Sequence, residues 1–272
     1  MHPAVWRDAF RAMGCAVQLE LVGGDEAVAA TGFSRSRRMI AELEQAWSRF
    51  LPDSDISRLN AAQGAMVPVH SATIELLRAM VQGSAATDGC FDPTLLAPLV
   101  ALGYDASWSD PQNVTSLPEG VAWRGGVAGV AVDPVASVAQ LPAGTVLDAG
   151  GIGKGMAADM VVAMLMGSGV AGAMVSIGGD LRVAGVGPHE GGWAIGVDDA
   201  FDGDGAGREA LQLSLADAGV ATSGTARRAW RNPSGVAVHH LLDPVTGSPL
   251  MGTVQATVVA GNAAWAEVFT KL

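Results

Sequence analysis

The hydrophobic positions of the chain follow two periods, and most of the short runs have the period of a β-strand. Residues 15–22 (Cys-Ala-Val-Gln-Leu-Glu-Leu-Val) alternate apolar and polar side chains, which is typical of a half-buried strand. The turn Gly178-Gly179-Asp180 joins two further runs and predicts a hairpin. The runs predicted as strands after residue 22 are 129–134, 145–147, 173–177, 181–186, 193–197, 211–215, 220–223 and 252–259.

Helical spacing occurs in five places. From about Glu26 to Phe50, the apolar side chains of Ile40, Leu43 and Trp47 share one face. The other helices are predicted from Ser54 through Asn60, from about Ser71 to Ala86, from Met156 to Met166, and from Ala263 onward. Strands and helices do not alternate strictly, so we predict an α+β fold with mixed, largely antiparallel sheets, flanking helices and two lobes.

The stretch 147–159 crowds four glycines around Lys154, between an apolar run and a helix start. Helix-start N–H groups and the helix dipole favour an anion, so phosphate oxygens are the expected ligand. The stretch is not a P-loop, because Gly155 follows the lysine where Ser or Thr is required. The alternating Gly151, Gly153 and Gly155 do not match the dinucleotide fingerprint either. The alternative is a tight strand-to-helix turn with a solvated lysine.

Composition and charge narrow the choice of partners. The chain has 272 residues, of which 49% are hydrophobic, and a formal net charge of −11. This acidic balance argues against a general nucleic-acid or anionic-membrane surface, so an anionic ligand needs a local basic pocket. No apolar run of about 18 residues lacks charges or glycine breaks, and we therefore expect no membrane span.

The cysteines and the N-terminus indicate no export signal. Cys15 and Cys90 have no CxxC spacing, which makes a disulfide framework or a cysteine zinc site an unfavoured interpretation. Residues 1–11 carry charges where a signal peptide has an apolar core, and no apolar segment precedes Cys15 as in a lipid-attachment site. We therefore expect a cytoplasmic protein.

Carboxylates stand in glycine or proline turns at the ends of several apolar runs, where ligand groups often gather. They are Asp92, Asp148, Asp180 and Asp243. Taken singly, each is more often ordinary turn chemistry. His240 lies beside an apolar run, where a histidine is more often a hydrogen-bonded core residue than a base. Carboxylates with hydroxyls suit a hard cation such as magnesium better than zinc.

Six segments, in this order, resemble one family. They are 47–60, 89–94 (Gly-Cys-Phe-Asp-Pro-Thr), 147–159, 177–180, 222–224 and 240–249. With them the chain resembles the ApbE family, flavin transferases that use FAD to modify other proteins, from Met13 to the C-terminus. The resemblance implies one ApbE-like domain over residues 1–272, with FAD in a cleft between the lobes. The family's usual final helix and strands do not follow Leu272, so we expect a short C-terminal end.

The resemblance also implies a reaction and its residues. FMN would pass from FAD to a threonine hydroxyl of an acceptor protein, with magnesium bound, and AMP would leave. The catalytic groups would be His240 as proton acceptor, Asp243 and Lys154. FAD would be contacted by Met13, Phe50, Asp92, Asp148, Lys154, Asp180, Ser223, Thr246 and Gly247. The magnesium ligands would be the Gly153 carbonyl, Glu267 and Thr270.

One segment departs from the family pattern. The family closes with Ala-Asp-x-x-x-Thr on a helix, and its Asp and Thr complete the magnesium site. Aligned on Thr270, the Asp position holds Ala266, and Glu267 follows it. Residues three apart on a helix share a face, so Glu267 is the expected substitute. Two other functions stay open on this scaffold: an FAD pyrophosphatase giving FMN and AMP, and an FAD-binding protein without turnover.

Overall fold

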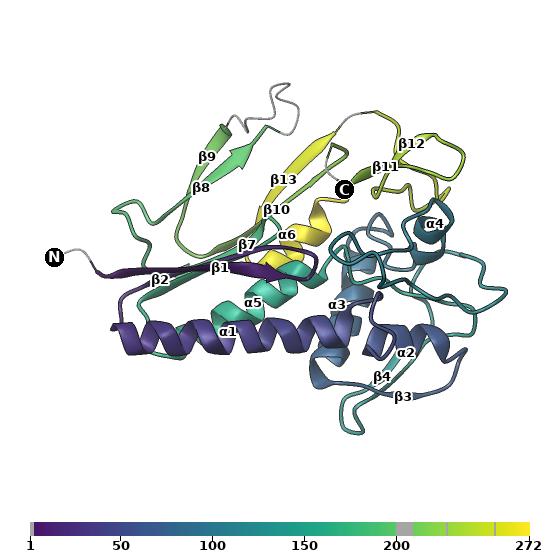
Figure 1. Ribbon diagram of the computed structural model, residues 1–272, viewed down its shortest axis with the longest axis horizontal. Coiled ribbons are helices and arrows are strands. Elements are labelled where there is room, and N and C mark those ends of the chain that lie inside the picture. The colour runs from purple at the N-terminus through teal and green to yellow at the C-terminus, as the bar shows by residue number, and fades with distance from the viewer. Residues whose placement is uncertain (1–2, 200–208, 227, 253) are drawn as a thin grey trace. The chain divides into compact units, whose positions relative to one another are not determined.

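The computed structural model describes residues 3–199, 209–226, 228–252 and 254–272 (Figure 1). Its chain divides into two compact units, which correspond to the two expected lobes. The first unit consists of residues 1–41, 154–226 and 254–270, and the second of 42–153, 227–253 and 271–272. One boundary falls inside helix α1 (Glu26–Trp47), and another separates Gly153 from Lys154.

The first unit is built on a six-stranded sheet with the order β1-β2-β6-β7-β10-β13. Its strands are β1 (Val5–Ala12), β2 (Cys15–Val22), β6 (Gly172–Ile177), β7 (Asp180–Gly185), β10 (Ala218–Gly224) and β13 (Gln255–Ala260). All neighbouring strands in this sheet run antiparallel. A separate hairpin, β8 (Trp193–Asp198) and β9 (Glu209–Leu215), contributes Trp193 and Ile195 to a hydrophobic cluster with Val183 and Val220.

Helices α1, α5 (Gly153–Met166) and α6 (Ala263–Phe269) include residues of the first unit. An added Cβ at Gly32 of α1 would lie 3.1 Å from Leu165 of α5 and 3.3 Å from Leu21 of β2. The missing side chain therefore lets α1 approach both elements. Arg37 of α1 also pairs with Asp8 of β1, at 2.6 Å.

The second unit combines short helices with two small antiparallel sheets. The helices are α2 (Asp55–Ala61), α3 (Ser71–Ala86) and α4 (Leu96–Ala101). One sheet has the order β3-β5-β4, with β3 (Val67–Pro68), β5 (Val138–Gln140) and β4 (Ala131–Asp133). The other pairs β11 (Ala229–Arg231) with β12 (Ala237–His239). Ser54 caps α2 by accepting from the Ser57 N–H at 3.0 Å, as predicted.

The strand predicted at 145–147 is wrong. Val146 and Leu147 are buried, which accounts for their apolar character, but no strand among the residues that the structure describes pairs with them. Both backbone groups of Leu147 bond instead to the Asn60 side chain, at 2.8 and 2.9 Å. The strand β1 was not predicted, because its half-buried positions include Asp8 as well as Trp6 and Phe10, so apolar and polar residues do not alternate in its sequence.

Helix boundaries also differ from the prediction. Helix α1 ends at Trp47 rather than at Phe50. Helix α5 begins at Gly153 rather than at Met156, because the Gly153 N–H already bonds to the Ala149 carbonyl at 2.8 Å. Lys154 therefore stands in the first turn of the helix.

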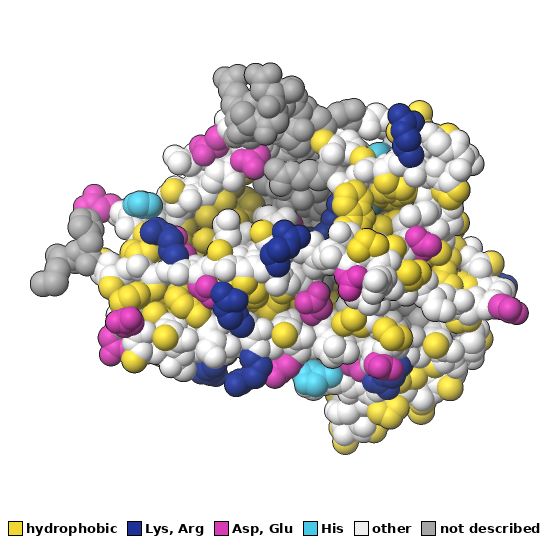
Figure 2. Space-filling model, in the orientation of Figure 1, with side chains coloured by type: hydrophobic (Ala, Val, Ile, Leu, Met, Phe, Trp, Pro, Cys, Tyr) yellow, Lys and Arg dark blue, Asp and Glu magenta, His cyan; other side chains and the backbone are white. Residues whose placement is uncertain are grey.

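The surface carries charges of both signs. On the face in Figure 2, Lys and Arg side chains are interspersed with Asp and Glu. In the part of the chain that the structure describes, no helix is long and apolar enough to cross a membrane.

Candidate functional site

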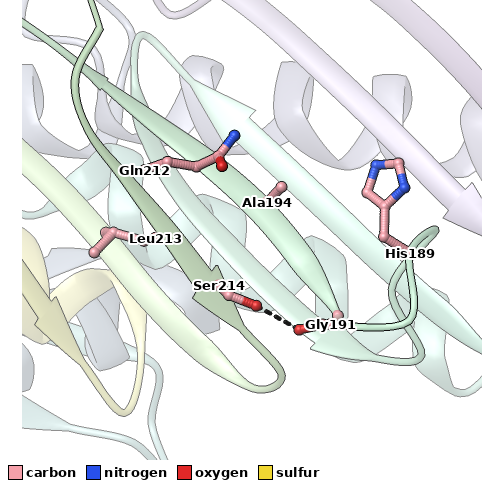
Figure 3. Close-up of a pocket in the computed structure, with 7 residues that line it drawn as sticks. His189, Gly191, Ala194, Gln212, Leu213 and Ser214 are labelled. Carbon is pink, nitrogen blue, oxygen red and sulfur yellow. Dashed lines mark hydrogen bonds between the residues drawn. The ribbon is translucent and has the colours of Figure 1, made fainter.

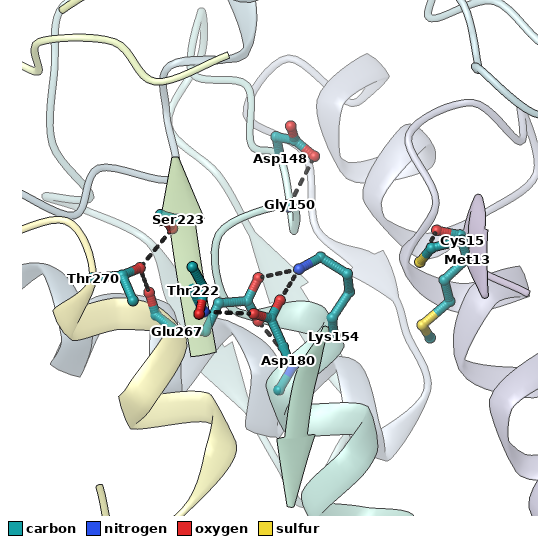
Figure 4. A network of polar contacts seen from close by, with 11 residues as sticks. Met13, Cys15, Asp148, Gly150, Lys154, Asp180, Thr222, Ser223, Glu267 and Thr270 are labelled. Carbon is teal, nitrogen blue, oxygen red and sulfur yellow. Dashed lines mark hydrogen bonds and ion pairs between the residues drawn. The ribbon is translucent and has the colours of Figure 1, made fainter. Parts of the chain in front are cut away.

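Lys154 is the centre of a charged cluster in the first unit (Figure 4). Its Nζ pairs with the Asp180 carboxylate at the start of β7, and with Glu267 Oε1 of α6 at 3.1 Å. The exposed fraction is 17% for the lysine side chain, 5% for Asp180 and 3% for Glu267. The structure thus brings together three predicted site residues from three distant segments.

Helix α6 supplies the far side of this cluster. Glu267 Oε2 accepts from the Gly155 N–H at 2.8 Å, so it satisfies a backbone donor in the first turn of α5. Thr270 Oγ1 donates to the Glu267 carbonyl at 2.6 Å. A 2.7 Å hydrogen bond joins Thr270 to Ser223 Oγ of β10. Ala266 is fully buried and has no carboxylate. Glu267 is the residue of this segment whose carboxylate pairs with Lys154.

Asp159 ties α5 to the start of α6. Its two carboxylate oxygens accept from the N–H groups of Ala263 and Ala264, at 2.8 and 2.9 Å. Burial raises the pKa of Asp159, although these two N–H groups and Arg182 partly offset the shift. Asp159 therefore holds the helix that carries Glu267 and Thr270.

The donor set of the Lys154 cluster fits a hard divalent cation. Two carboxylates and one ammonium leave a net charge of −1, next to the hydroxyls of Ser223 and Thr270. Mg²⁺ is usually held by one or two carboxylates, with waters and substrate phosphates completing its shell. Groups of three or more His, Cys, Asp or Glu side chains that could hold a metal do not occur among the described residues. An ion here would therefore need hydroxyl, carbonyl, water or phosphate ligands besides Asp180 and Glu267.

The predicted residue Met13 lies in the turn between β1 and β2, in the same unit. Its φ is +50°, and its carbonyl accepts from Cys15 Sγ at 3.2 Å. An added Cβ at Gly178 would lie 2.9 Å from Cys15 Sγ and 3.6 Å from Lys154 Cδ. Gly178 therefore brings the Cys15 turn and the lysine stem close together, a role for Cys15 that the sequence analysis missed.

In the second unit, Asp148 is held by a buried arginine. Arg49 is 4% exposed, and its Nε lies 3.5 Å from Asp148 Oδ2. The same guanidinium donates to Thr115 Oγ1 at 2.6 Å and to the Tyr104 carbonyl at 2.8 Å. Asp148 Oδ1 accepts from Gly150 at 3.1 Å. The sequence marked Asp148 but not Arg49, which orients it.

Phe50, a predicted FAD contact, belongs to an aromatic cluster in this unit. The Arg49 guanidinium lies 4.1 Å from the Phe50 ring centroid. Tyr104 lies 6.0 Å from Phe50, 5.3 Å from Trp230 and 6.3 Å from Trp108, between ring centroids. Trp108 is 56% exposed, so the cluster reaches solvent.

Asp92 and the Asp243 turn line one hollow of about 240 Å³ in the second unit. Asp92 Oδ1 accepts from the Thr94 N–H and hydroxyl at 2.8 and 2.7 Å, and Oδ2 accepts from Gly126 at 2.9 Å. Oδ1 therefore stabilises the turn that Asp92 itself begins, whereas Oδ2 binds a segment 34 positions further along the chain. Pro244 and Val245, which follow Asp243, line the same hollow.

The predicted catalytic turn is an Asx turn closed by Asp243. Its Oδ1 accepts from the Val245 N–H at 2.8 Å, and its Oδ2 from Thr246 Oγ1 at 3.1 Å. The Val245 N–H lowers the pKa of Asp243, and Thr246 acts in the same direction. Gly247 has φ +68°, and its N–H returns to the Asp243 carbonyl at 2.8 Å. His240 is half-buried just before this turn.

The irregular stretch 105–130 contacts three of these segments. Thr115 accepts from Arg49, and Gly126 donates to Asp92. An added Cβ at Gly247 would lie 3.0 Å from the Trp123 ring and 3.3 Å from Pro98. Pattern analysis missed this stretch because it has no periodicity.

A second hollow, of about 180 Å³, lies on the β8–β9 hairpin of the first unit (Figure 3). It is lined by His189, Gly191, Gly192, Ala194, Gln212, Leu213 and Ser214, and the Ser214 hydroxyl bonds to the Gly191 carbonyl. None of these lining residues is a predicted site residue.

The predicted site residues thus fall into two groups. The first unit holds Met13, Lys154, Asp180, Ser223, Glu267 and Thr270. The second holds Phe50, Asp92, Asp148, Gly153, His240, Asp243, Thr246 and Gly247. Their roles toward FAD and magnesium remain predictions.

Known proteins resemble this chain over the whole region that contains the predicted site residues. The profile described as the ApbE family matches residues 13–272. The chain belongs to the ApbE family. A relative named FAD:protein FMN transferase, from Treponema pallidum, is 32% identical over 228 residues, which are 78% of this chain and 61% of that protein. The chain spans 61 to 66% of the length of the first two curated relatives.

Solved ApbE-family structures share the fold. The ApbE protein of Thermotoga maritima matches with a TM-score of 0.83 at 26% identity, over 98% of this chain and 85% of that one. The apo form of the Pseudomonas stutzeri flavinyl transferase ApbE matches with a TM-score of 0.77 at 25% identity, over 100% and 84%. The predicted α+β fold with antiparallel sheets is therefore confirmed.

Proposed function

We propose that this chain transfers FMN from FAD to a threonine hydroxyl of an acceptor protein and releases AMP, with magnesium bound. The relatives' name, FAD:protein FMN transferase, supports the flavin donor and the protein acceptor. The observation that carries the proposal is the Lys154–Asp180–Glu267 cluster at the start of α5, in a chain of this family. A helix N-terminus with a lysine favours phosphate oxygens, and the carboxylates suit the cation that accompanies a pyrophosphate.

The chain's residues divide the chemistry between them. The acceptor oxygen bonds to the FMN phosphorus, the pyrophosphate P–O bond to AMP breaks, and the hydroxyl proton passes to His240. Lys154 binds the phosphate oxygens, and the positive end of the α5 dipole favours their negative charge. Asp243 keeps the turn after His240 in place through its bonds to Val245 and Thr246.

The proposed metal ligands are Glu267, Thr270 and the Gly153 carbonyl. Asp180 shares Lys154 with Glu267. A bound magnesium ion supplies charge neutralisation on the transferring phosphate. Glu267 would take the place of the aspartate that the family carries one position earlier, where this chain has Ala266.

Mass spectrometry of acceptor domains tests the proposal. The full chain is incubated with FAD, Mg²⁺ and threonine-bearing acceptor domains, and AMP is measured in the same samples. We expect one acceptor to gain the mass of one FMN group, linked through its phosphate, and its Thr→Ala variant to gain none. The His240→Gln enzyme should lose most of the transfer rate, on the order of 10²-fold or more. Free FMN and AMP without labelled acceptor would indicate a pyrophosphatase, and FAD binding without AMP a non-catalytic protein.

A further inference from the structure

Two buried carboxylates share one lysine at the start of α5. Asp180 and Glu267 have side chains that are only 5% and 3% exposed, and both pair with Lys154. Removing two carboxylates from water is costly unless a nearby cation compensates their charge. Lys154 therefore acts as the counter-ion of both carboxylates.

The exposure and flexibility of the Lys154 side chain would allow its ammonium to move away from the two carboxylates. Its side chain is 17% exposed, more than either partner, and its ammonium sits on a flexible four-carbon stem. Glu267 keeps the Gly155 N–H as a partner for Oε2 when the lysine moves. When a phosphate group is bound at the N-terminal turn of α5, its oxygens can pair with the displaced ammonium.

We propose that Lys154 is a resident counter-ion that a divalent cation displaces from Asp180 and Glu267. With the lysine in place the cluster has a net charge of −1. With a divalent cation in its place the two carboxylates are neutralised, and Lys154 is free to pair with phosphate oxygens. The lysine and the metal thus compete for the same carboxylates when no nucleotide is bound. This inference rests on the proposed function for its metal, Mg²⁺.

Metal binding without FAD tests the competition. Isothermal titration measures the Kd of Mg²⁺ for the wild type and for Lys154→Met, and Mn²⁺ with paramagnetic resonance detection serves as a second probe. We expect the Lys154→Met chain to bind Mg²⁺ about tenfold more tightly, because its competitor is gone. We also expect its Tm to fall without metal and to recover when Mg²⁺ is added.

The controls separate competition from general charge loss. Arg78→Met removes a cation of α3 in the second unit, where it pairs with Glu75 at 3.1 Å, and should leave the Kd unchanged. Lys154→Arg keeps the positive charge and should not tighten binding, whereas Glu267→Gln should weaken it. Lys154→Gln repeats the test with a polar side chain if the methionine variant does not fold.

Two results would overturn the inference. One is a Lys154→Met or Lys154→Gln chain that binds Mg²⁺ no more tightly than the wild type. The other is the absence of Mg²⁺ binding in all folded variants. Because FAD is not used, a chain that fails to transfer FMN but shows the tightened Kd would contradict the proposed function and leave the counter-ion role intact.

Discussion

At the scale of single residues, the candidate site depends on positions where a side chain would not fit. Gly178 has φ +65°, and an added Cβ would lie 2.9 Å from Cys15 Sγ and 3.1 Å from Cys15 Cβ. Gly179 has φ +98° and no such neighbour within 4 Å. A side chain at Gly179 would meet backbone strain alone, whereas a side chain at Gly178 would meet backbone strain and a steric contact with Cys15.

Gly178→Ala should cost more stability than Gly179→Ala. Positive φ alone costs roughly 1–3 kcal/mol at either position, and the contact with Cys15 should add roughly 1–2 kcal/mol at Gly178 only. Urea unfolding measures both losses. Cys15→Ala should recover part of the loss in the Gly178 variant and none in the Gly179 variant. Equal losses would mean that Cys15 does not limit the approach of this turn.

The ionisation of Asp243 gives a prediction for how the effect of replacing it depends on pH. Its folded pKa is lowered, first by the Val245 N–H, so its contribution to stability is present above its ordinary pKa and is lost as the pH falls through the folded value. Between about pH 5 and 8 it therefore stays ionised. If the chain transfers FMN as proposed, Asp243→Asn should lower the rate of that transfer by a constant factor across this range. A rate ratio that changes with pH there would show that Asp243 itself titrates.

At the scale of elements, helices α5 and α6 hold the metal-site candidates in place. Asp159 caps the first residues of α6, and Glu267 accepts from the first turn of α5. An added Cβ at Gly155 would lie 2.3 Å from the Ala263 carbonyl oxygen, which is backbone and cannot rotate away. The close approach of the two helices therefore requires glycine at position 155.

Gly155→Ala should force α5 and α6 apart. We expect a loss of about 3 kcal/mol or more in the free energy of unfolding. If the proposed Mg²⁺ site exists, it should also bind the ion more weakly, because Glu267 moves away from α5. Gly167→Ala is the matched control, since its nearest atom would be 3.5 Å away. That variant should change stability by less than about 1 kcal/mol. Similar stability in both variants, by thermal unfolding, would contradict the close packing.

At the scale of the whole molecule, the predicted site residues come from segments spread along the chain and grouped in two units. Lys154 is one of only two lysines in a chain with a net charge of −11. A ligand with phosphate groups therefore depends on local donors such as Lys154 and helix N-termini rather than on the overall field.

The sequence by itself determined the fold class, most of the strands and helices, and the segments that carry the candidate site. The fold class and the elements depend on local periodicity and turn chemistry, which neighbouring residues set. The site segments were marked by their resemblance to the ApbE family. Predicting 145–147 as a strand failed because the side chain of Asn60, 87 positions away, binds the backbone N–H and carbonyl of Leu147 that a neighbouring strand would otherwise bind.

Only the tertiary structure decided what each charged group pairs with. The sequence marked Lys154, Asp180 and Glu267 separately, whereas the fold places both carboxylates against the one ammonium. Cys15, Arg49 and the stretch 105–130 gained roles in the same way. Such pairings join residues far apart in the chain, and the cost of burying a charge depends on neighbours that local patterns do not reveal.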